Sequence, residues 1–310
     1  MSNKNVLITG IAGFIGSKIA ISLSQRGYNI YGIDNFRTGY AENIPHDVNF
    51  DECDISDAKN LERLPYKDID VVLHLAAQTS GELSHIHPEY DLLTNGFGTF
   101  NILQISKKLG IKKFIYASSM NVYGHNSRNP VKELDVLKPV SYYGISKTTG
   151  EYYVQSFSKY FDYTIFRMFN VFGPGQDMKN LSQGMLSIFL AYALENKEIL
   201  VKGDLNRFRD FIYIDEVVKH WLNCVESSRT DNKIYNLGSG KKTTVEYLIN
   251  VIQDKTNHSK KVKVVEGTPN DQFGIFADIS KLTNDTNLDI NTTLENGIDH
   301  LVNYLKNQKI

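Results

Sequence analysis

The chain has 310 residues, of which 41% are hydrophobic and 22% are charged, and its formal net charge is −1 at pH 7. This composition is typical of a globular protein, and the small net charge gives no general attraction to nucleic acid or to a membrane surface. The two cysteines, Cys53 and Cys224, are too few for a disulfide framework and lack zinc-type spacing, so we expect reduced, buried thiols and no metal site. No apolar run approaches the length of a membrane span and no leader precedes the first strand pattern, which favours the cytoplasm.

Short apolar runs alternate with amphipathic segments over the first part of the chain, which is the pattern of a parallel α/β sheet. We expect strands at 5–8, 29–33, 48–51, 71–75, 113–117 and 163–168, and helices at 13–26, 57–64, 90–109 and 142–160. After residue 170 the rhythm changes, with helices expected at 184–195, 215–226 and 244–256 and strands at 199–201, 209–213, 234–237 and 261–265. The sequence therefore predicts a doubly wound, Rossmann-type parallel sheet with a smaller C-terminal domain packed against it.

The first chemical signal is a glycine-rich turn, Gly10-Ile11-Ala12-Gly13-Phe14-Ile15-Gly16, directly after the first expected strand. Glycine spacing alone is a weak signal, but here a strand precedes it and an amphipathic helix follows it. Glycines allow a tight turn and a close approach to a phosphate, and the helix N-terminus offers free N–H groups and the positive end of a dipole. We interpret the turn as a dinucleotide pyrophosphate site rather than as an incidental βα connection.

Acidic residues follow the next two expected strands. Asp34 ends the second strand, where a carboxylate can accept both ribose hydroxyls of an adenosine and repel a 2′-phosphate, which favours NAD over NADP. Arg37 lies close by and weakens that preference, and a turn cap is the alternative role for Asp34. Asp54-Ile55 follows the third strand and could contact the adenine, although an N-cap for the next helix is an equally good interpretation of Asp54.

The fourth strand ends in small residues, Leu75-Ala76-Ala77, which would let a flat cofactor lie across the sheet edge. Asn95 lies in an expected helix that is otherwise apolar on the same face. It is a candidate cofactor contact, but a buried amide on a helix commonly bonds to backbone instead.

The second chemical signal is Tyr143-Gly144-Ile145-Ser146-Lys147, with Ser118-Ser119 upstream at the end of the fifth strand. Tyr143 and Lys147 are four residues apart and share a helix face. We expect the ammonium of Lys147 and a cationic nicotinamide to lower the pKa of the phenol toward a useful catalytic value, while Ser119 holds the same substrate oxygen. The pair alone could be a solvated helix face, and Tyr142 competes for the role but has no lysine at that spacing.

Taken together, these motifs resemble the extended short-chain dehydrogenase/reductases, and within them the nucleotide-sugar epimerase/dehydratase family typified by UDP-glucose 4-epimerase. The resemblance covers nearly the whole chain. Further stretches that carry it are Asn95-x-x-Gly98-Thr99-x-Asn101, Ser118-Ser119-x-x-Val122-Tyr123-Gly124, Phe169-Asn170-Val171-Phe172-Gly173-Pro174, Arg209-Asp210-Phe211-x-Tyr213-x-Asp215 and Tyr235-Asn236-Leu237-Gly238.

The resemblance implies roles for individual residues. Tyr143 would be the catalytic acid and base, Lys147 would bind the nicotinamide ribose, and Ser119 would assist proton transfer. NAD would be held by Gly10, Gly13, Phe14, Ile15, Gly16, Asp34, Asn35, Thr38, Gly39, Asp54, Ile55, Leu75, Ala76, Ala77, Asn95, Ala117, Tyr143, Lys147 and Phe169. A nucleotide sugar, UDP-linked in the typical members, would contact Ser119, Asn170, Asn180, Arg209 and Asp271, with Arg209 on the diphosphate and Arg207 as a competitor for that role.

Departures from the family pattern reduce the number of reactions that the resemblance allows. Relatives that act as 4,6-dehydratases carry an acid pair where this chain has Met120 and Asn121, and decarboxylases keep a glutamate at the second position. Thr268 stands where the epimerases often have a second phosphate-binding arginine. The resemblance therefore favours an NAD-dependent 4-epimerase of a UDP-hexose or UDP-N-acetylhexosamine. The alternatives are another dehydratase or reductase of the family, and a noncatalytic NAD-binding regulator.

The resemblance also implies an organisation for the whole molecule. Residues 1–170 and roughly 210–238 would form the NAD-binding domain, and residues 171–209 and 239–310 the domain that binds the nucleotide sugar. Two helices per subunit, near 95–109 and 143–160, would pair in a homodimer, although their apolar faces could equally belong to the internal core.

Overall fold

A seven-stranded parallel sheet forms the centre of the computed structural model, which describes residues 4–125, 128–180, 184–267 and 272–308. Its strand order is β11-β6-β5-β4-β1-β2-β3, and every neighbouring pair is parallel. The order reverses direction at β1, as it does in doubly wound dinucleotide-binding folds, and this confirms the predicted fold class. The strands are β1 (Asn5–Thr9), β2 (Asn29–Asp34), β3 (Asn49–Glu52), β4 (Val71–His74), β5 (Lys113–Ser119), β6 (Asp162–Met168) and β11 (Lys233–Leu237).

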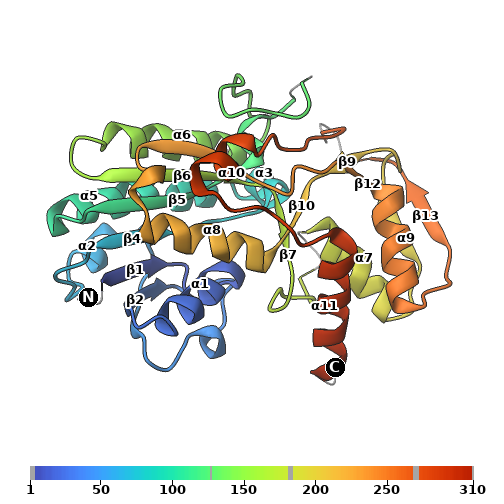
Figure 1. Cartoon of the computed structure of the whole chain (residues 1–310), viewed down its shortest axis with the longest axis horizontal. Coiled ribbons are helices and arrows are strands. Elements are labelled where there is room, and N and C mark those ends of the chain that lie inside the picture. The colour runs from blue at the N-terminus through green and yellow to red at the C-terminus, as the bar shows by residue number, and fades with distance from the viewer. Residues whose placement is uncertain (1–3, 126–127, 181–183, 268–271, 309–310) are drawn as a thin grey trace.

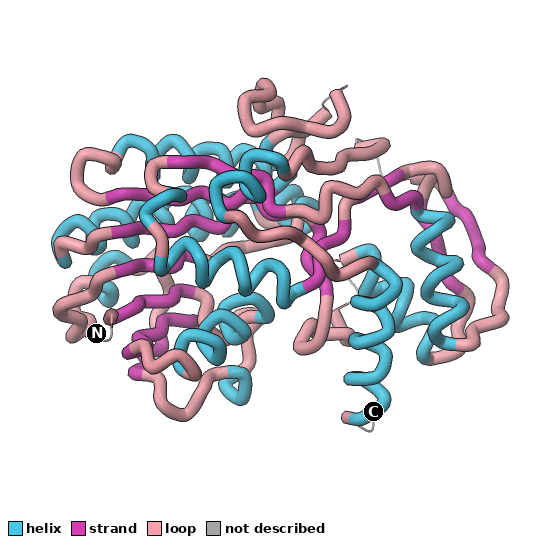
Figure 2. Tube along the Cα trace, in the orientation of Figure 1, coloured by secondary structure: helices cyan, strands magenta, loops and turns pink. Residues whose placement is uncertain are grey.

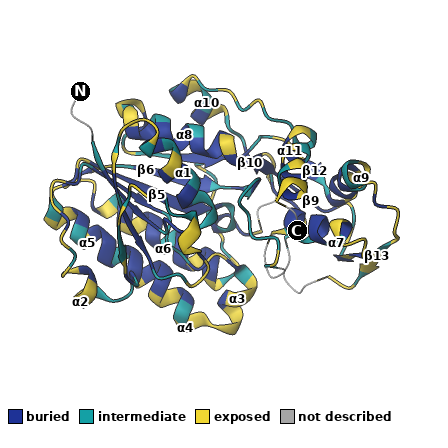
Figure 3. Ribbon diagram, turned by 90° about the horizontal axis from the view of Figure 1, so that it is seen from below, coloured by how far each residue is buried: buried dark blue, intermediate teal, exposed yellow. Residues whose placement is uncertain are grey.

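Helices cover both faces of this sheet (Figures 1 and 2). Successive side chains of β1 point to opposite faces, so Val6 and Ile8 enter one core while Leu7 enters the other. The first core lies under α1 (Phe14–Ser24) and α8 (Ile214–Glu226), and the second lies under α5 (Thr99–Leu109) and α6 (Tyr142–Ser156). The short α2 (Ala58–Leu61) adds Leu61 to the second core. Figure 3 shows the buried faces of these elements turned toward the sheet.

The helix expected at 90–109 is not one continuous α-helix. The chain forms α3 (Gly81–Ile86), α4 (Pro88–Asp91) and a π-helix over Leu92–Gly98 before α5 begins. Glycines at 96 and 98 lower the local preference for an α-helix, and a side chain at Gly98 would collide with Ile55 at 2.8 Å. The π-helix widens the turn that carries Asn95 and thereby changes where that amide points.

A second group of elements lies beside one end of the sheet (Figure 1). It contains α7 (Met185–Leu194), α9 (Val245–Thr256) and α11 (Leu294–Asn307), whose apolar faces extend the first core. Three strand pairs accompany them: β7 (Asn170–Phe172) with β10 (Phe211–Tyr213), β9 (Phe208–Arg209) with β12 (Thr243–Thr244), and β8 (Ile199–Lys202) with β13 (Val262–Val265). The remaining helix, α10 (Ser280–Thr286), lies beside β11.

A buried carboxylate joins the C-terminal segments. Asp210 is fully buried between β9 and β10, and it accepts hydrogen bonds from Ser239 N at 2.6 Å, Ser239 Oγ at 2.6 Å, Gly240 N at 3.0 Å and Ala277 N at 3.1 Å. Burial raises its pKa, and these hydrogen bonds oppose that rise. One side chain therefore fixes the loop after β11 and the segment before α10 to the same strand end.

Cys53 and Cys224 are both free and buried, as expected. None of the helices within the described ranges is long and apolar enough to cross a membrane. Over the same ranges no cluster of three His, Cys, Asp or Glu side chains could hold a metal ion.

Candidate active site

The glycine turn between β1 and α1 leaves no room for side chains. Gly10 has a φ of +73°, and a Cβ atom there would lie 2.7 Å from Ala76 N. A Cβ on Gly16 would lie 2.2 Å from Gly10 O. Gly13 is the N-cap of α1 and contributes no side-chain cap, so the first N–H groups of the helix face the cavity unpaired by an acidic side chain. This backbone can hold a pyrophosphate through N–H groups and the helix dipole.

Asp34 has the turn-capping role that was one of the two considered for it, and it also borders the cavity. It lines the cavity and is 8% exposed, while its two oxygens accept Ala12 N and Phe36 N, each at 2.9 Å. Burial raises the pKa of this carboxyl despite those backbone bonds. The side chain therefore ties the glycine turn to the end of β2 and also presents a carboxylate at the place expected for an adenosine ribose.

Arg37 and Tyr90 form part of the cavity wall near Asp34. The Arg37 guanidinium lies 3.8 Å from the centre of the Tyr90 ring, and both residues line the cavity. Asp54 does not line it: one oxygen accepts Asn35 Nδ2 at 2.8 Å, and the other accepts the N–H and hydroxyl of Ser56. In this structure Asp54 thus positions Asn35 and the turn after β3, whereas Ile55 does reach the cavity.

Asn95 lies behind the cavity wall rather than in it. It is fully buried, and its amide accepts Gln78 N at 2.9 Å and donates to Gln78 O at 2.9 Å. The same amide contacts the carboxylate of Asp91 at 3.1 Å and Ser146 Oγ at 3.2 Å. The structure thus gives Asn95 the backbone-bonding role, which fixes the loop after β4 against α6.

Ser119, Tyr143 and Lys147 meet at the carboxyl end of β5 and line one cavity. Ser141 caps α6 by accepting Gly144 N at 3.1 Å, and the helix then carries Tyr143 and Lys147 on its buried face. Tyr143 is 6% exposed, whereas its competitor Tyr142 is 48% exposed and faces away. The choice of Tyr143 over Tyr142 therefore agrees with their positions.

In the protein without its cofactor, burial is the main influence on the pKa of Tyr143. Burial raises the pKa of Tyr143 to about 12, and only a hydrogen bond with Ser119 opposes it. Lys147 donates to Ala117 O at 2.9 Å, and burial lowers the pKa of its amine to about 8 despite the nearby carboxylates of Asp91 and Glu151. The fold therefore keeps the phenol protonated and makes the lysine easy to deprotonate.

The expected sugar-binding residues divide into three groups. Asn170 and Asn180 line the cavity, and Asn170 Nδ2 donates to Asp210 O at 2.8 Å. Arg209 is 7% exposed and does not line it, and its guanidinium donates to Phe208 O at 2.8 Å and Phe273 O at 3.3 Å. Burial, and then the charge of Arg207, lowers the pKa of Arg209 to about 10. Asp271 and Thr268 lie outside the described residues.

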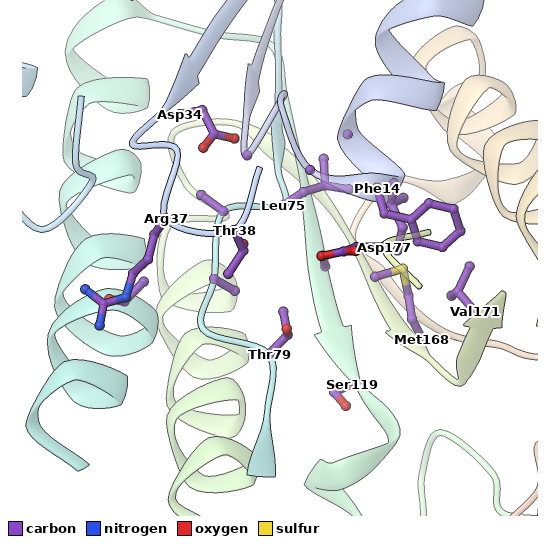
Figure 4. A pocket seen from close by; sticks show the side chains of 18 of the residues that line it. Phe14, Asp34, Arg37, Thr38, Leu75, Thr79, Ser119, Met168, Val171 and Asp177 are labelled. Carbon is purple, nitrogen blue, oxygen red and sulfur yellow. The ribbon is translucent and has the colours of Figure 1, made fainter. Parts of the chain in front are cut away.

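The cavity itself is a single hollow of about 370 Å³ that runs from Asp34 to Ser119 (Figure 4). Most of the expected cofactor residues border it, including Phe14, Ile15, Thr38, Leu75, Ala117 and Phe169, but Gly39 does not. Sequence reasoning missed a second set of lining residues, Tyr40, Asn43, Thr94, Met168, Gln176 and Asp177. Tyr40 and Asp177 come from opposite sides of the cavity and are joined by a 3.0 Å hydrogen bond, which no sequence signal predicts.

The fold, the glycine turn and the Ser-Tyr-Lys group define a short-chain dehydrogenase/reductase with a dinucleotide site. A family model described as "NAD dependent epimerase/dehydratase family" matches residues 6–238, and the chain belongs to that family. Its cofactor is NAD, as the resemblance implies. The site fits that group because Gly10 and Gly16 leave no room for a side chain at the turn and Asp34 borders the same cavity.

Three solved structures are similar over almost the whole chain. The UDP-glucose 4-epimerase of Thermotoga maritima, solved with UDP-glucose, is 34% identical, with a TM-score of 0.94 and coverage of 98% of this chain and 99% of that one. The UDP-N-acetylglucosamine 4-epimerase of Methanobrevibacter ruminantium, in complex with UDP-N-acetylmuramic acid, is 32% identical, with a TM-score of 0.92 and coverage of 99% of this chain and 100% of that one. The Thermus thermophilus UDP-glucose 4-epimerase, in complex with NAD, is 28% identical, with a TM-score of 0.90 and coverage of 97% of this chain and 99% of that one.

The glycine turn provides a direct test of the cofactor site. Gly16→Ala places a methyl group 2.2 Å from Gly10 O, so the turn must open and its N–H groups must move. We expect the Kd for NAD to rise at least tenfold, measured by calorimetric titration of the stripped protein. Gly110→Ala, at the C-cap of α5 and with nothing within 4 Å of its added carbon, is the control for a glycine replacement that causes no clash in the turn. Equal NAD affinity in the Gly16 variant and the wild type would contradict this account of the turn.

Proposed function

We propose that this protein is an NAD-dependent 4-epimerase of a UDP-hexose or a UDP-N-acetylhexosamine. The observation that carries the proposal is the meeting of Ser119, Tyr143 and Lys147 at one end of the cavity whose other end holds the glycine turn and Asp34. NAD, when bound, supplies a hydride acceptor that can return the hydride to the opposite face of the sugar carbon. The chain itself must bind the sugar, move one proton and exclude other reactions.

The proton steps fall to two hydroxyl groups. Tyr143 exchanges a proton with the oxygen on C4 of the sugar, and Ser119, which hydrogen-bonds to Tyr143, holds the same oxygen. Because burial keeps the phenol neutral in the protein alone, the positive charges gathered at the site have to lower its pKa before it can accept a proton. Lys147 supplies one such charge below its own pKa of about 8.

The described residues beside Ser119 include no carboxylate, and this favours a reaction that goes no further than C4. Among the described residues that line the cavity, Asp34 and Asp177 are the only acids, and Asp34 lies at the ribose end. Beside Ser119 the chain has Met120 and Asn121, and the Asn121 backbone and amide both donate to Ser119 Oγ at 3.2 and 3.3 Å. With no acid next to the catalytic hydroxyl, a 4-keto sugar formed there has no group to promote elimination or decarboxylation. This supports epimerisation over the dehydratase alternative.

The first test is chemical. Purified protein with bound NAD should interconvert UDP-glucose with UDP-galactose, or the two N-acetyl forms, without net formation of NADH, as followed by chromatography and absorbance. Tyr143→Phe should lower kcat by at least a thousandfold while NAD stays bound, because the variant lacks only the phenolic oxygen. Tyr142→Phe is the matched control and should keep full activity. No interconversion of either pair by the wild type would refute the proposal.

The second test uses the charge of Lys147. Its amine is protonated below its pKa of about 8 and neutral above it, so kcat/KM should fall as the pH rises through about 8. Asp91→Asn removes a carboxylate that raises the pKa of Lys147, and the fall should therefore move to lower pH. Asp70→Asn, at a surface pair with Lys112, should leave the profile unchanged. A profile that is identical in wild type and Asp91→Asn would contradict the assignment.

We also propose that the protein is a homodimer. The π-helix and the adjoining α6 carry large apolar side chains that are exposed in the single chain, among them Leu92 at 62%, Leu93 at 50%, Ile145 at 47% and Tyr152 at 64%. A contiguous apolar surface of this kind is typical of an interface. Ile145 and Tyr152 lie on the expected pairing helix near 143–160, and their exposure supports the dimer rather than an internal core for that face.

Sedimentation analysis tests this proposal. The wild type should sediment as a dimer, and Leu92→Glu combined with Tyr152→Glu should shift it to a monomer by placing charges in the apolar contact. Val264→Glu, at an exposed position on β13, is the control and should leave the dimer intact. A monomeric wild type at micromolar concentration would overturn the assignment.

A further inference from the structure

Three consecutive residues at the end of β5 are each tied to a different turn of α6. Lys147 Nζ donates to Ala117 O at 2.9 Å, Ser118 Oγ donates to Glu151 Oε1 at 2.5 Å, and Ser119 hydrogen-bonds to Tyr143. Tyr143, Lys147 and Glu151 follow one another at intervals of four residues, so they form one stripe along the helix. The two catalytic residues of the helix thus share their face with a carboxylate that the proposed chemistry does not use.

Glu151 is held by an arginine from the next strand. Arg167 on β6 donates through Nε to Oε1 at 2.9 Å and through Nη2 to Oε2 at 2.7 Å, which is a two-pronged pairing. Glu151 is 1% exposed and Arg167 is 3% exposed. A buried ion pair costs desolvation energy and adds little net stability. The fixed geometry of this pair is therefore a better guide to its role than its contribution to stability.

Arg167 is itself fixed from the other side. Its Nη1 donates to Tyr123 OH at 3.0 Å and to Glu133 O at 2.8 Å, and Tyr123 OH donates to Asn236 Oδ1 at 2.6 Å. Asn236 lies on β11, so the guanidinium is anchored to segments on both sides of β6. Its planar head cannot turn without breaking several of these bonds, and the carboxylate of Glu151 is therefore held in one place.

We propose that Glu151, gripped by Arg167, is a positioning residue that sets how far along β5 the helix α6 sits, and thereby places Tyr143 and Lys147 against Ser119. The proposal rests on the function proposed above for its kinetic part, but not for its effect on cofactor binding. Ser118 is the link that transmits the position from the carboxylate to the strand, since its neighbours Ala117 and Ser119 contact the catalytic side chains directly. A shift of the helix by a fraction of its rise per residue would separate the phenol from Ser119.

Removing Glu151 alone would leave a buried guanidinium without its partner and could unfold the protein. The test therefore replaces both partners by neutral side chains of similar size, as Glu151→Gln with Arg167→Met, and separately removes the strand link with Ser118→Ala. The matched control is Lys113→Met with Asp231→Asn, which removes another ion pair of 2.5 Å at the opposite end of the same strand. The control pair lies far from the cavity and touches none of the catalytic residues.

At a temperature well below each Tm, we expect kcat to fall about tenfold to a hundredfold in the Glu151/Arg167 variant and about tenfold in Ser118→Ala. KM should stay within about twofold in both, because the sugar-binding groups are untouched. The control should lose thermal stability but keep kcat. If the test variants lost no more kcat than the control at comparable Tm, the pair would be merely structural and the proposal would fail.

A second measurement keeps this test independent of the sugar reaction. Lys147 borders the cofactor cavity, so a misplaced helix should also raise the Kd for NAD about tenfold in the Glu151/Arg167 variant and not in the control. If the wild type epimerises no sugar, the proposed function fails while this binding comparison still decides the positioning role. In that case a Kd for NAD that is unchanged in the Glu151/Arg167 variant overturns the positioning role by itself.

Discussion

The contact between the end of β5 and the buried face of α6 is the constraint on which the site depends. The strand supplies Ser119 and the helix supplies Tyr143 and Lys147, so neither element contains the chemistry alone. Parallel strands end at the same sheet edge, and this brings the glycine turn after β1 to the same cavity as Ser119. The rest of the fold holds the ends of β1 and β5 and the buried face of α6 in fixed positions relative to one another.

The electrostatics of that contact are unfavourable by themselves. Burial raises the pKa of the Tyr143 phenol and lowers that of the Lys147 amine, so it shifts both groups toward their neutral forms. Asp91 and Glu151 counter this for the lysine, although the charge of Asp91 raises the pKa of the tyrosine further. A site built in this way holds its proton on the phenol until a cation arrives, which suits a reaction in which one proton is removed and then returned.

The sheet could be predicted from the sequence because its signals are local. Apolar runs flanked by turn residues located each strand of the main sheet to within one or two residues, and Asp34 followed from its place at the end of β2. The π-helix over Leu92–Gly98 could not be predicted in this way, since an amphipathic pattern does not distinguish it from an α-helix. Helices α3, α10 and α11 were also missed. The first two are short, but α11 has a threonine N-cap and apolar residues at helical spacing, so a closer analysis of the sequence would have found it.

The site was predictable as a set of residue types but not as a set of contacts. Motif spacing pointed to Tyr143 and Lys147, but it gave no sign that the Lys147 amine donates to Ala117 O. Asn95 and Asp54 occupy motif positions but bond to the loops behind the cavity wall. Such distinctions depend on which way a side chain turns within one helical turn or loop, and the sequence carries no periodic signal for that.

The side chains beside Ser119 bear on whether the proposed reaction goes beyond C4 of the sugar. Elimination or decarboxylation needs a second acid or base beside the one that handles the C4 oxygen, and Asn121 uses its polar groups as donors to Ser119 instead. An amide donor cannot accept a proton from carbon at neutral pH, but it can fix the direction of the serine hydroxyl. If the proposed chemistry holds, an amide in place of a carboxylate at this position withholds the acid or base that elimination and decarboxylation need, and it leaves the serine hydroxyl with two fixed donors.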